Sequence, residues 1–279
     1  MRSLSIVSIT LIILCLGLGL LSFFTKAERT ITYFPIDPSK NFIQAETRFS
    51  FDEANQELSW KAHSKSSEPA YLRQDLSLLF VNGRLKGILN RWREQERTIE
   101  LEESFPLTSP SLLQAISFHH GEWQDKERIT SNQQMTNATA YLLEGNFVEK
   151  LTNKKDKDLA KELITIIDSE LNLYWEDLIQ HYGLNEIDYL FFSLAELDHL
   201  AQYLTRKLSP EASAKIIGQL WEGLYKNYLL LAVEEHSNDY MPLVLLAKDL
   251  SHLYVLFQIK GVDYQLRQQI TLENIHILH

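Results

Sequence analysis

The stretch from Leu76 to Trp92 reads LSLLFVNGRLKGILNRW and decides the fold of the first half of the chain. Two largely apolar runs flank the pair Asn82-Gly83. Asn-Gly between apolar runs is the strongest short-range signal for a β-hairpin, because a type I′ turn needs a positive φ at both central residues. The stretch therefore predicts two antiparallel strands joined at residues 82 and 83.

Further strands are expected on both sides of this hairpin. Alternation of polar and apolar residues, typical of half-buried strands, marks three stretches: residues 30–34, 47–51 and 58–62. Residues 98–105 supply another strand. Residues 112–119 and 123–129 form either a hairpin or one long bent strand around residues 120–122. We therefore expect residues 28–150 to form an antiparallel β-sheet domain with one covered face.

The second half of the chain, residues 151–279, shows the 3.6-residue period of amphipathic helices. Four helical segments are expected, at residues 159–182, 187–208, 209–236 and 239–260. Ser209 followed by Pro210 is a favoured helix start. Short loops between helices of similar length favour an up-down bundle, and the imperfect alternation of residues 270–278 predicts a late strand. The expected fold class is α+β, with a four-helix segment after the sheet.

The N-terminus carries a charge-free run of 21 residues from Leu4 to Phe24. About 20 apolar residues cross a bilayer as a helix, so residues 1–27 predict a transmembrane anchor. Arg2 precedes the run, which places the short N-terminus in the cytosol and the rest of the chain outside it. The alternative is a cleavable signal peptide with a mature start at Glu28, and the protein would then be secreted. The run exceeds the roughly 7–15 residues of a signal core, which favours the anchor.

Composition restricts the classes of partner and chemistry. A net charge of -10 argues against binding nucleic acid, which needs excess Lys and Arg. The single cysteine, Cys15, lies in the apolar run. Thiol catalysis and cysteine-ligated zinc are therefore excluded from the rest of the chain. Lack of disulfides there is typical of an exported bacterial protein more than of a secreted animal one.

Two motifs in the expected helices resemble metal ligands. Glu-x-x-His and its aspartate version, with a glutamate from each of two other helices, are the ligand set of di-iron bundles. The set would be Glu170, Glu196, His199, Glu222, Asp249 and His252. At about 100° per residue, His199 lies roughly 160° from Leu197 on the apolar stripe. His199 would then point away from the bundle interior, so we expect these residues to form solvated polar faces.

The sequence His119-His120-Gly121-Glu122 is a second metal candidate. Neighbouring residues on a strand point to opposite faces, so His119 and His120 cannot easily share one ion. His120 and Glu122 can face the same side, but the sequence offers no third ligand beside them. A zinc site is therefore disfavoured, and we expect no metal and no other cofactor.

No catalytic residue can be assigned from the sequence. It contains no Gly-x-Ser-x-Gly elbow, no P-loop and no Rossmann glycine pattern. We therefore expect a membrane-anchored extracytoplasmic module that binds or regulates an envelope protein or a ligand. The alternative is an envelope hydrolase that uses a carboxylate pair or a metal. A pocket joining two or more carboxylates with His120 or His199 would favour the hydrolase.

Overall fold

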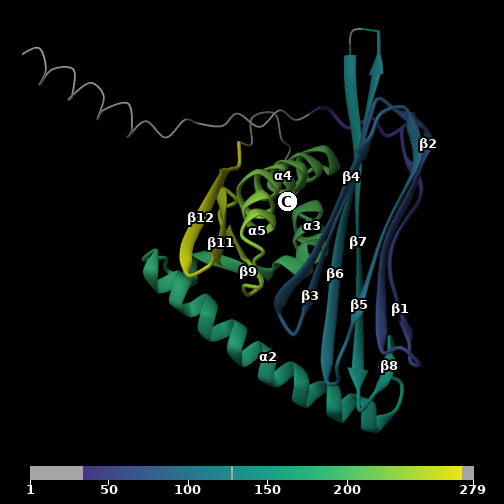
Figure 1. Ribbon diagram of the computed structural model, residues 1–279. Helices are drawn as coiled ribbons and strands as arrows, with labels where there is room; N and C mark the ends of the chain where they lie inside the picture. Colours follow the sequence, from purple (N-terminus) through teal and green to yellow (C-terminus); the bar gives the residue numbers. More distant parts are fainter. Residues whose placement is uncertain (1–33, 127, 272–279) are drawn as a thin grey trace, which may run out of the picture. The chain divides into compact units, whose positions relative to one another are not determined.

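The computed structural model describes residues 34–126 and 128–271 as three antiparallel sheets and a group of helices (Figure 1). The first sheet has the order β1-β2-β5, with strands β1 (Phe42–Asp52), β2 (Glu57–Ala70) and β5 (Glu96–Pro106). The second sheet has the order β4-β3-β6-β7-β8. Its strands are β3 (Leu72–Val81), β4 (Arg84–Arg93), β6 (Ser111–Asp125), β7 (Arg128–Leu143) and β8 (Asn146–Val148).

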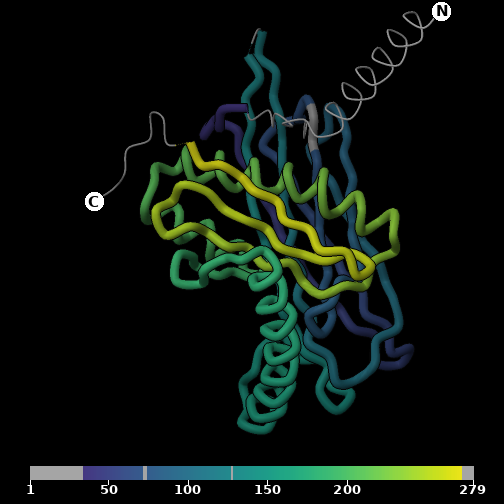
Figure 2. Tube along the Cα trace, turned by 90° about the vertical axis from the view of Figure 1, so that its left-hand side faces the viewer, coloured from purple at the N-terminus to yellow at the C-terminus, as the bar shows by residue number. Residues whose placement is uncertain are grey.

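The third sheet and the helices come from the second half of the chain (Figure 2). This sheet has the order β12-β11-β10-β9, with β9 (Tyr189–Ser193), β10 (Leu243–Ala247), β11 (His252–Ile259) and β12 (Val262–Gln269). The helices are α2 (Lys154–His181), α3 (Leu197–Thr205), α4 (Pro210–Leu224) and α5 (Leu230–Glu234). Short helical turns cover Glu186–Asp188 and Leu194–Glu196, and a π-helical stretch, Tyr225–Leu229, joins α4 to α5.

The hairpin predicted at residues 82 and 83 is confirmed. Val81 pairs with Arg84, and the φ angles of Asn82 and Gly83 are 51° and 73°. The side-chain oxygen of Asn82 also accepts a hydrogen bond of 2.7 Å from the backbone N–H of Leu112. The turn is therefore tied to the neighbouring strand β6 as well as closing its own hairpin.

Strand β6 runs unbroken through the His120-Gly121 pair, so the long-strand alternative is the one observed. It lies at the centre of the second sheet and is buried on both faces. Leu113 and Ala115 pack toward the first sheet, while Ile116 and Phe118 pack toward the helices. Fully burying one such leucine or phenylalanine contributes about 1.5–3 kcal/mol. This strand therefore links the core of the sandwich to the core under the helices.

The prediction of a four-helix segment is wrong, and the largest error is the fourth helix. Residues 239–260 form β10 and β11, joined by a turn in which Leu250 has a φ of 59°. The run Leu243–Ala247 is buried throughout. Alternate residues pack against α2 and against the main core. A strand covered on both faces carries the same continuous apolar run as a buried helix, and periodicity cannot separate the two.

The second predicted helix, residues 187–208, is also mostly wrong. Its aromatic start, Tyr189–Ser193, forms edge strand β9, as β-branched and aromatic runs tend to do. Only Leu197–Thr205 is α-helical, as α3. The third predicted helix is present from Pro210 to Glu234, and Ser209 caps it by accepting from the N–H of Ala212 at 3.2 Å.

The predicted membrane anchor has no counterpart in the described structure. Among the described residues, no helix combines the length and the apolar character needed to cross a bilayer. The run Leu4–Phe24, on which that prediction depended, lies outside the described residues. So do residues 30–33 of one predicted strand and 272–278 of the predicted late strand.

Candidate functional site

The residues of the predicted di-iron set are engaged locally and separately. Glu196 accepts hydrogen bonds from the backbone and the hydroxyl of Ser193 at 3.3 and 2.9 Å. Glu222 pairs with Lys226 on the same helix at 2.5 Å. The His199 side chain is 62% exposed. These contacts are those of helix caps and solvated faces.

The remaining members of the set lie apart from any common centre. Glu170 accepts a hydrogen bond of 2.9 Å from the hydroxyl of Tyr240. Asp249 lies in the turn between β10 and β11, and His252 begins β11, so the predicted helical spacing between them does not exist. In the part of the chain that the structure describes, no three His, Cys, Asp or Glu residues form a group that could hold a metal.

The strand geometry places His120 and Glu122 on one face of β6 and His119 on the other. Nε2 of His120 lies 3.1 Å from Oε1 of Glu122. The His120 ring stacks on Phe118, with ring centroids 6.0 Å apart. His119 points into the sandwich between the first two sheets, where it meets a set of polar residues that the sequence reasoning missed.

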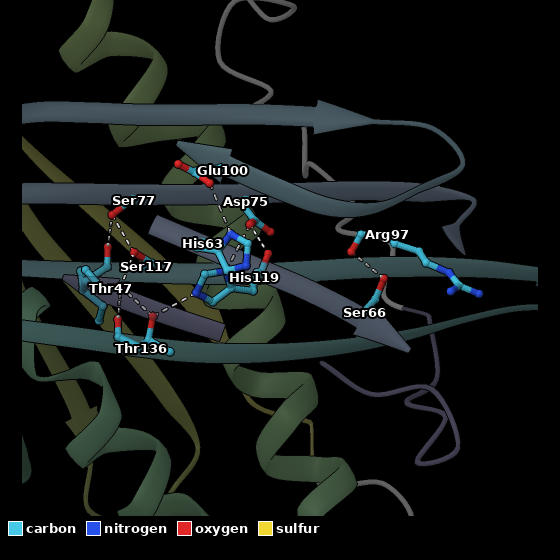
Figure 3. Close-up of polar contacts among 12 residues, drawn as sticks. Thr47, His63, Ser66, Asp75, Ser77, Arg97, Glu100, Ser117, His119 and Thr136 are labelled. Carbon is cyan, nitrogen blue, oxygen red and sulfur yellow. Dashed lines mark hydrogen bonds and ion pairs between the residues drawn. The ribbon is translucent and has the colours of Figure 1, made fainter. Parts of the chain in front are cut away.

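A continuous chain of polar side chains runs through the interior of the sandwich (Figure 3). It begins on β2, passes through β3, β6, β1, β7 and β6 again, and returns to β2 by way of β3. Its members in order are Trp60, Ser77, Ser117, Thr47, Thr136, His119, Asp75 and Ser64. The chain therefore joins the two sheets at several points.

Its first half consists of hydroxyl groups. The indole N–H of Trp60 donates to the Ser77 hydroxyl at 3.1 Å. Ser117 donates to Ser77 and accepts from Thr47, both at 2.6 Å. Thr47 and Thr136 lie 2.6 Å apart at their hydroxyl oxygens. Because each hydroxyl both donates and accepts, a row of them satisfies itself inside an apolar core.

Its second half joins a carboxylate, an imidazole and a hydroxyl. Nε2 of His119 lies 2.9 Å from the Thr136 hydroxyl, and Nδ1 lies 3.3 Å from Oδ2 of Asp75. The Ser64 hydroxyl donates to the same oxygen of Asp75. This is the order of groups in a hydrolase triad. However, the side chains of Asp75 and His119 are fully buried, so a substrate has no access to them, and we assign the chain a structural role.

A hollow of about 1060 Å³ opens at one end of the sandwich. Three parts of the chain form its walls: residues 35–40; Glu68, Pro69 and Tyr71 with Gln95; and residues 123–126 with Arg128 and Thr130, at the ends of β6 and β7. No motif marks it in the sequence, because its walls come from segments up to about ninety residues apart.

The first wall is fastened to β7. Ser131 donates its N–H to the carbonyl of Pro35 at 2.8 Å and accepts from the N–H of Asp37 at 2.9 Å. Lys40 in this wall pairs with Glu68 in the second wall. Hydrogen bonds from the hydroxyl and the N–H of Ser39 hold the pKa of Asp37 below its usual value. The wall is therefore fixed without a ligand.

The floor and the open sides of the hollow carry uncommitted polar groups. Trp123 is 5% exposed, and its indole N–H has no hydrogen-bond partner among the described residues. Its ring lies so close over Gly121 that a Cβ there would come within 2.6 Å of it. Tyr71 is 43% exposed. A hollow that exposes an aromatic ring beside polar side chains has the features of a ligand site.

Comparisons with known proteins identify no relative. No protein-family model and no curated protein matches the sequence. Two solved structures align over part of the fold. The CARDB domain of the PF1109 protein from Pyrococcus furiosus, in complex with di-metal ions, is 10% identical, with a TM-score of 0.22 over 38% of this chain and 97% of that chain. The sporulation control protein Spo0M from Bacillus subtilis is 11% identical, with a TM-score of 0.15 over 86% of this chain and 91% of that chain. Likenesses this weak establish neither fold nor function.

Proposed function

We propose that the protein is a binding module that holds its ligand in the hollow between residues 35–40, residues 68–71 and the β6–β7 turn. The observation that carries the proposal is a hollow of about 1060 Å³ that exposes the ring of Tyr71 and whose walls are held in place by hydrogen bonds and an ion pair within the protein.

The hollow fits a hydrolase less well. Among the described residues, three carboxylates line it, from Asp37, Glu68 and Asp125, but neither His120 nor His199 does. Asp37 is occupied by Ser39, and Glu68 by Lys40. A hydrolytic acid–base pair needs two available carboxyl groups flanking one bond, and only that of Asp125 is available here.

A pulldown from the native cells tests the proposal. The full chain is crosslinked in place, recovered, and compared with a double variant, Tyr71→Ala with Arg128→Ala. The matched control is Trp92→Ala, which removes an aromatic ring that is 55% exposed on β4 and does not line the hollow. We expect the bound species to be lost from the double variant and kept by the control. Equal recovery from all three proteins would contradict the proposal.

We also propose where the protein acts and on what kind of partner. The sequence supports an extracytoplasmic location and a partner in the envelope, and the acidic net charge of -10 supports a partner other than nucleic acid. A phosphatase reporter fused to the C-terminus, active only outside the cytosol, tests the location. An inactive reporter at normal protein level would contradict it.

A further inference from the structure

The third sheet ends in a strand whose outer edge pairs with no described strand. β12 is the last strand in the order β12-β11-β10-β9, and Figure 1 shows it at the margin of the sheet. It pairs with β11 over all eight of its residues without a register shift, and none of the eight is buried. A regular and accessible edge of this length is a template for a further strand.

Alternate residues of β12 direct their backbone groups away from β11. The N–H of Ile270 donates to the carbonyl of Ser251 at 2.9 Å, at the end of the β11–β12 ladder. Hydrogen-bonded and non-hydrogen-bonded pairs alternate along an antiparallel ladder, so the even-numbered residues of β12 bond to β11. The N–H and C=O groups of the odd-numbered residues therefore point outward, in a row of four: Asp263, Gln265, Arg267 and Gln269.

The opposite edge of the same sheet is less open. By the same alternation, the outward backbone groups of β9 belong to Tyr189, Phe191 and Ser193. The N–H of Tyr189 donates to the carbonyl of Glu186, and the N–H of Ser193 donates to the side chain of Glu196 at 3.3 Å. β12 is therefore the edge of this sheet that is better able to accept a strand.

The outward residues of β12 carry one charge of each sign. Asp263 is held at the edge by Gln258, whose amide donates to its carboxylate at 2.8 Å, and the carboxylate lies 3.5 Å from Nδ1 of His181. Arg267 is exposed and forms no ion pair with any described residue, and its guanidinium carbon lies 5.8 Å from the centre of the Tyr254 ring. Opposite charges directly across two antiparallel strands stabilise the pair, and like charges destabilise it. An incoming strand should therefore place a cation opposite Asp263 and an anion opposite Arg267.

A second copy of β12 meets this requirement. We infer that the protein forms a twofold-symmetric dimer in which the β12 strands of two copies pair antiparallel about Gln265. In this register, Asp263 of each copy lies opposite Arg267 of the other, and Gln265 lies opposite its own counterpart. Every other antiparallel register that pairs two of the four outward residues lacks this charge match. A twofold axis uses the same surface on both subunits, so one strand supplies both halves of each ion pair.

The same register also extends the apolar core. Tyr264 and Leu266 alternate with the outward residues and pack, half-buried, against the main core. The ring of Tyr264 stacks on that of Phe257, with ring centroids 5.2 Å apart. Pairing about Gln265 sets Tyr264 of one copy opposite Leu266 of the other, in a non-hydrogen-bonded pair whose side chains approach closely. The hollow is not involved, because its described lining includes no residue of β12, so the inference is independent of the proposed function.

Cysteine crosslinking of the full chain in intact cells tests the dimer and its register. Cys15 is the single cysteine, so Cys15→Ser gives a background without thiols. Gln265→Cys in this background sets two thiols across the twofold axis, where facing Cα atoms lie about 5.5 Å apart, within the range of a disulfide. Gln269→Cys is the matched control on the same edge, because its two copies would lie eight positions apart along the strands, or about 27 Å.

After oxidation, we expect Gln265→Cys to give a disulfide-linked species of twice the 32.5 kDa chain mass. Its yield should exceed that from Gln269→Cys by about tenfold or more. The inference is overturned if Gln265→Cys gives no dimer, if both variants give equal amounts, or if Gln265→Cys links to a protein other than a second copy.

A charge swap within the Gln265→Cys protein tests the pairing of Asp263 with Arg267. Asp263→Arg and Arg267→Asp each set like charges opposite one another and should lower the dimer yield by about tenfold. The two changes together restore opposite charges and should return the yield to within about twofold of the unswapped protein. The contacts of Asp263 with Gln258 and His181 cannot explain such a rescue, because the double variant lacks them too. A folded double variant, checked by thermal melting, that forms no more dimer than the single variants would overturn the inference.

Discussion

Replacing His119 alone should destabilise the protein more than replacing His119 and Asp75 together. His119→Leu leaves the carboxylate of Asp75 fully buried without its imidazole neighbour at 3.3 Å. Removing the neighbour of a buried ionisable group costs up to about 3–5 kcal/mol. The double variant, Asp75→Leu with His119→Leu, buries no charge and loses mainly the partner of the Ser64 hydroxyl, at a cost of about 1–3 kcal/mol. The double variant should therefore be more stable than His119→Leu by about 2 kcal/mol.

Urea unfolding at neutral pH, followed by tryptophan fluorescence, measures these differences as shifts in the unfolding midpoint. His63→Leu is the matched control, because His63 lies on the outer face of β2, 3.8 Å from an exposed Glu100. It should cost less than about 1 kcal/mol. The coupling would be refuted if the double variant lost as much free energy of unfolding as Asp75→Leu and His119→Leu lose together when each is measured alone. A cost below about 1 kcal/mol for His119→Leu would refute the buried pair itself.

Three further predictions concern a turn and two titrating groups. Gly83→Ala should lower the free energy of unfolding in urea by about 2–4 kcal/mol, because φ is 73° and the added Cβ would lie 3.1 Å from Leu171 of α2. Gly145→Ala is the control: its φ is 85°, but no atom lies within 4 Å of the added Cβ, so it should cost about 1 kcal/mol. Burial raises the pKa of Tyr228 far above its usual value of 10.0. The unfolded chain therefore loses this proton at a lower pH than the folded chain, and stability should fall as the pH rises above about 10. In melting curves recorded at alkaline pH, Tyr228→Phe should show a smaller fall than the wild type. The lowered pKa of Asp37 stabilises the fold at pH values above its unfolded value of 3.8, and this contribution is lost as the pH falls through the lowered pKa. Ser39→Ala should therefore lower the melting temperature at pH 7, and its difference from the wild type should shrink as the pH falls below 3.8.

The sequence predicts local structure well where a short motif determines it. Asn82-Gly83 fixes both the hairpin and its register, because few other residues adopt its φ angles. Ser209-Pro210 fixes the start of α4 for a similar reason. In both cases the decisive interactions lie within a few residues along the chain.

The errors arise where tertiary burial determines the structure. The run Leu243–Ala247 is apolar on every face because β10 lies between α2 and the main core, and the sequence does not reveal these two neighbours. The Asp75–His119 contact joins strands more than forty residues apart, so no local spacing predicts it. One signal was present: a carboxylate, Asp75, directly before the largely apolar run Leu76–Val81 of the hairpin. Burying a carboxylate requires a partner.

Photo-crosslinking from inside the hollow tests the binding role most directly. Benzoylphenylalanine in place of Gln124, which lines the hollow, reacts with any C–H bond within reach, whether of a glycan or of a protein. The same group in place of Lys161, exposed on α2, reports contacts outside the hollow. After irradiation of intact cells, we expect one defined mass adduct on the full chain at position 124 and none at position 161. No adduct at 124, or the same adduct at both positions, would contradict a ligand held in the hollow.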